Sequence, residues 1–439
     1  MNIRGTPNQG LFGATLGFFI GFAAVALFGP TAAAFKDAVG LSPMMVGFLV
    51  AMPSLSGSLL RIPFAAWVDT VGGRKPFLVL LGISIVGMAG LTVLVTMYYP
   101  DRLTPGMTPL LFFLGLLVGC GIATFSVGIA QVSYWFPKAK QGTALGTYAG
   151  IGNLAPGIFS FLLPLALVNI GMGGSYLLWL VILVLGTFGY YIAGRNAPYF
   201  QAVHSGRSKQ EAVEIGRQHG QEMFPQGKLK DSLVSSAKIW KTWTLVAIYF
   251  TTFGGFIALT SWLPTYWREF FGKEAVVAGS LTAAYSITAS LMRVIGGRFA
   301  DKVGGEVSTI LSLAVMLAGA VGMFISRNFG LSLAAVIIMA IGMGVGNASV
   351  FKLVPQYVSQ AVGGASGWVG GLGAFGGFTI PPILGAIVAA QGDTGYPGGF
   401  ILFIGLGLIA IGLAYLLKRT HKVVSVTATP VNQPSQEVS

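Results

Sequence analysis

Two arginines occupy equivalent positions in two apolar segments of the chain. Arg61 opens the segment RIPFAAWVD and Arg293 opens RVIGGRFAD, so each lies eight residues before an aspartate, Asp69 or Asp301. At about 1.5 Å per helical residue, each arginine lies roughly 12 Å from its helix end, near the middle of an apolar layer about 30 Å thick. A charge at that depth costs at least about 2.5 to 3.5 kcal/mol unless it has a partner or a water-filled cavity. The pair therefore predicts an anion-binding site.

Carboxylate partners for these arginines are not expected inside the membrane, because none of the 13 Asp and Glu residues falls within a predicted span. A guanidinium presents parallel N–H donors in one plane, which suit a small flat anion better than a point-like ammonium does. Pairing with Asp69 and Asp301, two turns away in the loops, is the competing interpretation.

The composition predicts an all-α membrane protein. The chain is 54% hydrophobic and 9% charged, whereas a soluble domain carries about 25% charged residues. Its apolar runs have the length of membrane-spanning helices. We expect twelve spans, at about residues 10–35, 44–68, 77–98, 109–135, 142–168, 175–193, 243–267, 277–299, 308–326, 330–354, 363–390 and 398–417.

The polar segments divide the chain into two pseudo-symmetric halves of six helices. Residues 1–193 form the predicted N-terminal half, 194–241 a linker and 242–418 the C-terminal half, and 419–439 form a polar tail expected to be disordered. Within the linker, residues 211–223 are expected to form a short surface helix.

The net charge of +13 does not indicate nucleic-acid binding, because the cations gather on one side of the predicted topology. With the N-terminus inside, eighteen of the 26 Lys and Arg residues are cytosolic, as the positive-inside rule requires. We therefore expect a multi-pass protein of the cell inner membrane with both termini cytosolic. The single Cys120 excludes an internal disulfide, and no metal ion or cofactor is expected.

A short loop motif follows each arginine segment. DTVGGRK begins at Asp69 and DKVGG begins at Asp301, and both resemble the loop signature of the major facilitator superfamily. The glycines permit a tight turn between helices, and an aspartate can engage a neighbouring arginine in only one of two domain positions. Asp69, Arg74 and Asp301 are therefore predicted to form a gating loop, although the second copy lacks the basic pair.

A second repeat consists of glycines. GTYAGIGNLAPG begins at Gly146 and GWVGGLGAFGGF begins at Gly367, which aligns three pairs of glycines: Gly146 with Gly367, Gly150 with Gly371, and Gly152 with Gly373. Without side chains, two helix backbones can approach closely, slide, or expose peptide groups to a small ligand. Helix packing alone is the simpler interpretation of the same pattern.

These paired glycine stretches resemble the signatures of the nitrate/nitrite porter family of that superfamily. The resemblance covers nearly the whole chain, including the arginines, ATFSVGIAQVSYWFP from Ala123 and GVGNASVFKLVP from Gly344. It implies a secondary transporter that moves nitrate or nitrite by alternating access, as a monomer among membrane lipids. Because an axis along the membrane normal relates the halves of such transporters, Arg61 and Arg293 should face each other.

By the same resemblance, three further residues join the predicted site. The ring of Phe125 would sandwich the flat anion, the amide of Asn153 would donate a hydrogen bond, and so would the hydroxyl of Tyr249. Ordinary packing is the alternative for the two aromatic residues. Lys352 is open to three interpretations: it snorkels to water, provides a third cation, or carries a proton.

The preferred mechanism is exchange of nitrate for nitrite, because the predicted spans contain no Asp, Glu or His to carry a proton. A proton-coupled nitrate symporter and an oxalate/formate-type carboxylate antiporter are the alternatives within transport. An anion channel would not need matching loops in two halves. An enzyme is not expected, because the sequence shows no metal-ligand cluster, nucleophile arrangement or phosphate loop.

Overall fold

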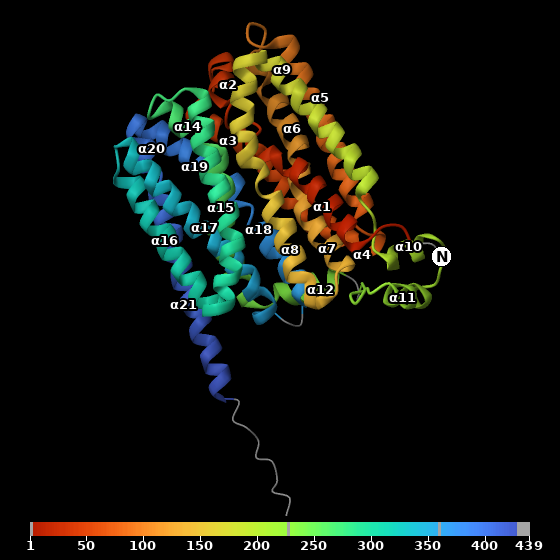
Figure 1. Ribbon diagram of the computed structural model, residues 1–439. Coiled ribbons are helices and arrows are strands. Elements are labelled where there is room, and N and C mark those ends of the chain that lie inside the picture. Colours follow the sequence, from red (N-terminus) through yellow and green to blue (C-terminus); the bar gives the residue numbers. More distant parts are fainter. Residues whose placement is uncertain (1–2, 226–228, 359–360, 428–439) are drawn as a thin grey trace, which may run out of the picture.

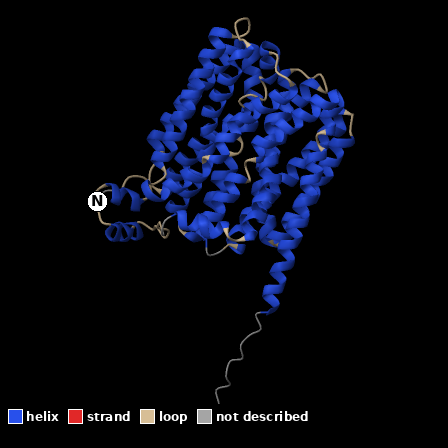
Figure 2. Ribbon diagram, turned by 180° about the vertical axis from the view of Figure 1, so that it is seen from behind, coloured by secondary structure: helices blue, strands red, loops and turns tan. Residues whose placement is uncertain are grey.

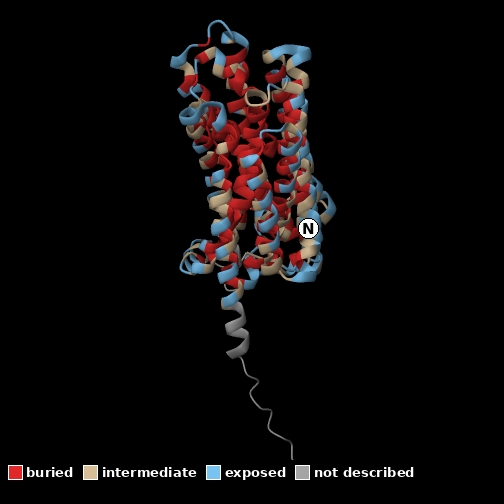
Figure 3. Cartoon of the chain, turned by 90° about the vertical axis from the view of Figure 1, so that its left-hand side faces the viewer, coloured by how far each residue is buried: buried red, intermediate tan, exposed pale blue. Residues whose placement is uncertain are grey.

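The structure is a computed structural model that describes residues 3–225, 229–358 and 361–427. Within these residues every regular element is a helix (Figure 2). A backbone that crosses lipid must satisfy its own N–H and C=O groups, and a helix does so within one segment. Buried residues run along the interior of the bundle (Figure 3), while many large apolar side chains on its outside are exposed, as lipid contact requires.

The N-terminal half contains six spans, and the first of them ends at Ala26 rather than near residue 35 as predicted. Its elements are α1 (Pro7–Phe22), η1 (Ala23–Ala26), α2 (Ala32–Val39), α3 (Pro43–Leu59), α4 (Arg61–Val71), α5 (Arg74–Tyr98), η2 (Pro105–Met107), α6 (Thr108–Gly119), η3 (Cys120–Ala123), α7 (Thr124–Trp135), α8 (Lys138–Gly152) and α9 (Ala155–Ala193).

The C-terminal half repeats this arrangement after three short linker helices, which are α10 (Pro198–His204), α11 (Lys209–Gln218) and α12 (Leu229–Ala237). Its elements are α13 (Trp240–Tyr249), the π-helical turn η4 (Phe250–Gly254), α14 (Gly255–Glu269), α15 (Ala275–Val303), α16 (Gly305–Ile325), α17 (Phe329–Tyr357), α18 (Val362–Leu372), α19 (Gly376–Gln391), η6 (Gly392–Thr394), α20 (Gly395–Gly398) and α21 (Ile401–Thr427). The two halves stand side by side (Figure 1).

Eleven helical stretches among the described residues are long and apolar enough to cross a membrane. One of them covers Thr143–Ala193, which is 51 residues and far more than the roughly 20 that one crossing needs. Its helix α9 turns at Gly171, where φ is 68° and ψ is −177°, a conformation that glycine adopts without a steric penalty. This stretch accounts for two crossings, so the predicted fold of twelve spans is confirmed.

The loops and the linker lie at the two ends of the bundle. We call the end that carries α10, α11 and α12 the linker side, and the opposite end, which carries α2, the far side (Figure 1). On the linker side, α10 and α11 extend sideways from the N-terminal half in two opposite views (Figures 1 and 2).

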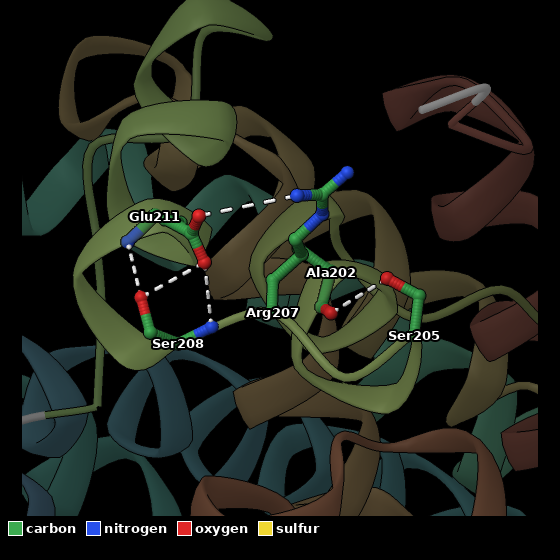
Figure 4. Close-up of polar contacts among 5 residues, drawn as sticks. All are labelled: Ala202, Ser205, Arg207, Ser208 and Glu211. Carbon is green, nitrogen blue, oxygen red and sulfur yellow. Dashed lines mark hydrogen bonds and ion pairs between the residues drawn. The ribbon is translucent and has the colours of Figure 1, made fainter.

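The linker contains more regular structure than predicted. The expected surface helix is α11, and it begins with a capping box in which the Ser208 N–H donates to Glu211 and the Glu211 N–H donates to the Ser208 hydroxyl (Figure 4). These bonds, the backbone one above all, hold the pKa of Glu211 below its ordinary value. Arg207 lies 3.9 Å from the same carboxyl group.

The helix α21 extends to Thr427, beyond Lys418, where the sequence predicted the start of a disordered tail. No glycine or proline interrupts the chain between Lys418 and Thr427, so each added residue can extend a helix already formed. Disorder of the tail stays a prediction. Residues 428–439, the rest of the predicted tail, lie outside the described residues.

Several spans are interrupted near the middle of the bundle. The second span breaks at Leu60 between α3 and α4, since Pro63 has no N–H to donate to the carbonyl of Leu59. The fourth span contains η3, the seventh contains η4, and the fifth and eleventh break after Gly152 and Leu372. By contrast, α15 and α17 are continuous. Interrupted helices of this kind form ligand sites in transporters, because the breaks release backbone groups and change the helix phase.

Candidate functional site: an arginine pair between aromatic rings

Arg61 lies at the break of the second span and is fully buried. Its Nη1 donates a 2.8 Å hydrogen bond to the carbonyl of Gly370, which belongs to α18 in the opposite half. Its Nε and Nη2 atoms are buried and have no hydrogen-bond partner among the described residues. A guanidinium has five N–H donors, so most of the donors of Arg61 remain available to a ligand.

Arg293 lies on the continuous helix α15 and is half-buried. Its Nη1 is also buried and has no hydrogen-bond partner among the described residues. No ion pair between described residues includes either arginine; the three that form involve other side chains. The competing interpretation, pairing with Asp69 and Asp301, therefore does not describe this structure.

Two aromatic rings bring the arginines together. The guanidinium carbon of Arg61 lies 4.8 Å from the ring centre of Phe125 and 5.3 Å from that of Phe253. The guanidinium carbon of Arg293 lies 5.7 and 5.3 Å from the same two rings. Both arginines therefore contact both rings within the range of cation–π attraction. The two like charges therefore share the same pair of rings, and neither forms an ion pair with a described carboxylate.

The π-helical turn η4 supplies one of these rings. Tyr249 ends α13, and its ring stacks on Phe253 with centroids 4.8 Å apart. Phe351 from α17 packs on Tyr249 at 5.0 Å and lies 5.8 Å from the guanidinium carbon of Arg293. Tyr249 is fully buried. The structure therefore places the predicted Tyr249 in the same aromatic cluster as both arginines.

Asn153 caps the end of α8, where the fifth span breaks. Its backbone carbonyl accepts a 2.8 Å hydrogen bond from Ser290, one turn before Arg293 on α15. Its side chain is buried, and Oδ1 has no partner among the described residues. Asn153 therefore joins the interface between the halves beside the helix that carries Arg293.

The three glycine pairs differ in what surrounds them. A Cβ on Gly150 would lie 3.0 Å from Val294 Cγ2, and a Cβ on Gly371 would lie 2.9 Å from Ile62 Cγ1. Val294 and Ile62 directly follow Arg293 and Arg61. Each middle glycine thus contacts the residue after the opposite half's arginine, as the pseudo-two-fold relation requires.

The other two pairs do not form this contact. Gly152 packs against Phe18 and Gly373 against Tyr249, both within their own half. A Cβ on Gly146 would meet nothing within 4 Å, and one on Gly367 would meet only Leu233 of the linker helix α12 at 3.5 Å. The glycine repeat therefore combines contact between the halves, packing within each half, and open surface.

The predicted gating residues pair within their own halves. The Tyr134 hydroxyl donates to Asp69 at 2.7 Å, and Arg74 Nη2 donates to the carbonyl of Tyr191 at 2.8 Å. Lys352 Nζ donates to Asp301 at 2.8 Å and to the carbonyl of Ala300 at 2.7 Å. The ion pair of Lys352 with Asp301 is none of the three interpretations given for this lysine; snorkelling comes nearest, because the side chain is partly exposed at the end of its helix. A latch between the halves remains a prediction.

Sequence reasoning missed three site residues: Phe253, Phe351 and Gly370. Phe253 lies in the run TTFGGF, which contains no residue of unusual chemistry. Phe351 lies within the quoted stretch GVGNASVFKLVP, and Gly370 within the quoted glycine stretch. The sequence showed that Phe351 and Gly370 belong to a signature, but it did not show that either contacts an arginine. Among the described residues, no group of His, Cys, Asp and Glu could hold a metal ion.

Two halves of interrupted membrane helices around a central polar site define a secondary transporter of the major facilitator fold. The Major Facilitator Superfamily model matches residues 14–381 and 274–437, and the chain belongs to that superfamily. The fold is shared with the xylose transporter XylE from E. coli, solved in a partially occluded inward-open conformation. That likeness has a TM-score of 0.70 at 15% identity and covers 93% of this chain and 97% of the other.

Within the superfamily, the chain belongs to the nitrate/nitrite porter family. It is 28% identical to a probable nitrate transporter, NarT, of Staphylococcus epidermidis, over 94% of this chain and 97% of the relative. It is 30% identical to a probable nitrate/nitrite antiporter, NarK1, of Thermus thermophilus, over 89% and 87%. It is 29% identical to the nitrite extrusion protein of Bacillus subtilis strain 168, over 83% and 82%.

Proposed function

We propose that this protein is a secondary transporter that exchanges nitrate for nitrite across the cytoplasmic membrane by alternating access. The observation that carries the proposal is the shared contact of Arg61 and Arg293 with Phe125 and Phe253, because it gathers two cations with unpaired donors at the interface of the halves. The names of the relatives support nitrate and nitrite as the cargo.

The chemistry of this site suits a small planar monoanion. Nitrate and nitrite are flat and carry weakly basic oxygens, so they can accept two parallel N–H bonds from one guanidinium. The aromatic faces of Phe125 and Phe253 would border the anion and exclude water, which strengthens each charge-assisted hydrogen bond. Asn153 and Tyr249 would add neutral donors at the rim.

Exchange follows from the charge of the site. Without a bound anion, Arg61 and Arg293 place two positive charges at the interface between the halves, and this interface must close during transport. One bound monoanion lowers the local charge from +2 to +1 and so reduces the repulsion as the halves close. Lys352, the remaining candidate for proton transfer, is engaged with Asp301 at the end of its helix. The halves should therefore change between their two orientations only when an anion is bound.

The proposal includes the orientation of the chain and a role in transport rather than catalysis. The linker side carries α11 and α12 with their lysines and arginines, which the positive-inside rule assigns to the cytosol. Both termini would then be cytosolic, in a monomer embedded in the inner membrane.

Flux measurements on purified protein in proteoliposomes test the mechanism. Vesicles loaded with nitrite should take up labelled nitrate, whereas vesicles without internal anion should take up little, with or without an imposed pH gradient. Uphill nitrate uptake driven by the pH gradient alone would replace exchange with proton symport. Competition by oxalate or formate as strong as that by nitrite would favour a carboxylate antiporter.

A further inference from the structure

A second basic site lies on the linker side, away from the arginine pair. It is a pocket of about 510 Å³ between the N-terminal segment, the start of α5 and the loop after α9. Three arginines line it, with polar side chains between them: Arg4, Arg74, Arg195, Asn196, Gln201 and His204. No acidic residue lines the pocket.

Polar side chains fix the backbone around this pocket. Asn196 Oδ1 accepts the backbone N–H of Arg74 at 2.9 Å. The Gln201 side chain accepts the Arg4 N–H at 2.9 Å and donates to the Arg4 carbonyl at 2.8 Å. Gln131 and Trp135 donate to the carbonyl of Arg195 at 3.0 and 2.9 Å. The positions from which the three arginines extend are therefore set by the fold.

No carboxylate of a described residue forms an ion pair with these three arginines. The ion pairs found among the described residues lie elsewhere: Lys36 with Glu269, Arg207 with Glu211, and Lys352 with Asp301. Arg74 donates from Nη2 to the Tyr191 carbonyl, yet its buried Nε has no partner among the described residues. Three cations at one pocket repel one another, so an anion bound among them is favoured.

The pocket opens beside the lipid-facing surface of α9. The guanidinium carbon of Arg74 lies 4.8 Å from the ring centre of Tyr191, and Tyr191, Ile192 and Phe188 are 54%, 53% and 59% exposed. On the same side, α10 and α11 extend sideways from the bundle, where the surface of the membrane would meet them (Figures 1 and 2). An anion with apolar chains could therefore place its charge in the pocket and its chains along α9.

We propose that this pocket binds the phosphate of an anionic phospholipid from the linker-side leaflet. The guanidinium groups match phosphate oxygens through paired N–H bonds, and clustered basic residues at a membrane surface attract anionic lipids. Free inorganic phosphate has the same chemistry without the chains, so the test compares the two sources.

The test uses the purified full-length protein in detergent with three probes: dioctanoyl-phosphatidylglycerol, dioctanoyl-phosphatidylcholine and inorganic phosphate. Phosphatidylglycerol should raise the midpoint of thermal unfolding. Phosphatidylcholine, whose choline cation is repelled by the arginines, should raise it far less. At equal concentration, inorganic phosphate should raise this midpoint less than phosphatidylglycerol does, because phosphate has no acyl chains to contact α9. Native mass spectrometry counts the lipids retained.

The variant Arg4→Gln/Arg195→Gln removes two of the charges without altering the backbone bonds that fix the pocket. It should weaken the apparent affinity for phosphatidylglycerol at least tenfold and retain fewer lipid molecules. Arg207→Gln is the control, because Arg207 lies on the same linker beside Glu211 (Figure 4) and does not line the pocket. Unchanged lipid affinity in the double variant, or an equal loss in Arg207→Gln, would overturn the site. Equal stabilisation by inorganic phosphate would overturn the lipid as its ligand.

Discussion

The guanidinium of Arg61 crosses the interface between the halves and donates a 2.8 Å hydrogen bond to the carbonyl of Gly370. Gly370 lies in the last turn of α18, where carbonyl groups lack helical partners and attract a cation. At the equivalent position of the other half, the Ala149 carbonyl accepts the backbone N–H of Asn153 at 3.1 Å. The two arginines are therefore unequal: Arg61 links the halves, while no matching bond from Arg293 is found among the described residues.

Replacing either arginine by lysine should weaken nitrate binding. Arg61→Lys and Arg293→Lys keep the charge but lose the planar pair of donors, so the affinity should fall at least tenfold, or about 1.4 kcal/mol. Calorimetric titration of the purified variants with nitrate measures the effect. Arg298→Lys is the control, since Arg298 is exposed on the same helix as Arg293. Wild-type affinity in both site variants would remove these arginines from the site.

The middle glycines, Gly150 and Gly371, should tolerate side chains far less well than Gly146 and Gly367 of the same repeat. Gly150→Leu and Gly371→Leu would place branched carbons where Val294 and Ile62 of the opposite half already lie, so exchange should be lost while protein still inserts in the membrane. Gly146→Ala and Gly367→Ala should transport normally, because each has space for a Cβ. Anion flux is measured in proteoliposomes at equal protein content. Normal transport by both leucine variants would mean that Gly150 and Gly371 serve only ordinary helix packing.

Loss of the Phe253 ring should weaken anion binding through both arginines. Phe253→Leu keeps much of the apolar volume but removes a cation–π contact of Arg61 and one of Arg293, each worth about 0.5 to 2 kcal/mol. We expect nitrate affinity to fall at least about fivefold in binding titrations, since the two contacts together are worth at least about 1 kcal/mol. Phe256→Leu is the matched control, because Phe256 stacks on Phe253 at 5.9 Å and forms none of the cation–π contacts of the two arginines. An equal loss in the control would mean that general packing, rather than the contact with the arginines, causes the effect.

An ion pair between the halves should hold the far side closed. Lys36 on α2 lies 2.6 Å from Glu269 at the end of α14, and the two side chains are 33% and 26% exposed. A partly exposed pair contributes about 0.2 to 1 kcal/mol, so Lys36→Met should raise the population open on the far side by up to about fivefold.

Thiol labelling can measure that opening. In a Cys120→Ala background, a cysteine replacing Ser261, whose carbonyl lies against Gly29 of the other half, should react faster when Lys36 is replaced. Exchanging the two charges in Lys36→Glu/Glu269→Lys should restore slow labelling. If Lys36→Met labels at the wild-type rate, the ion pair does not gate the far side.

The sequence by itself determined the membrane architecture and pointed to the main members of the proposed site. Composition and run length fixed the spans because lipid requires about 20 apolar residues per crossing. Repetition identified the arginines and the middle glycines, because two halves with the same fold place equivalent residues symmetrically. Arg61 and Arg293 were predictable because a charge at that depth is costly unless it has a partner or a water-filled cavity.

Only the tertiary structure decided how these residues meet. Gly370 and Arg61 are 309 positions apart in the chain, and no local pattern selects that carbonyl among its neighbours. Phe253 faces the arginines through a π-helical turn that changes the phase of its helix, and a regular helical period cannot predict such a turn. Nothing in the sequence indicates that Lys352 pairs with Asp301, which lies on another helix at the linker side. In each case the deciding contact joins distant segments, so it exists only once the helices have packed.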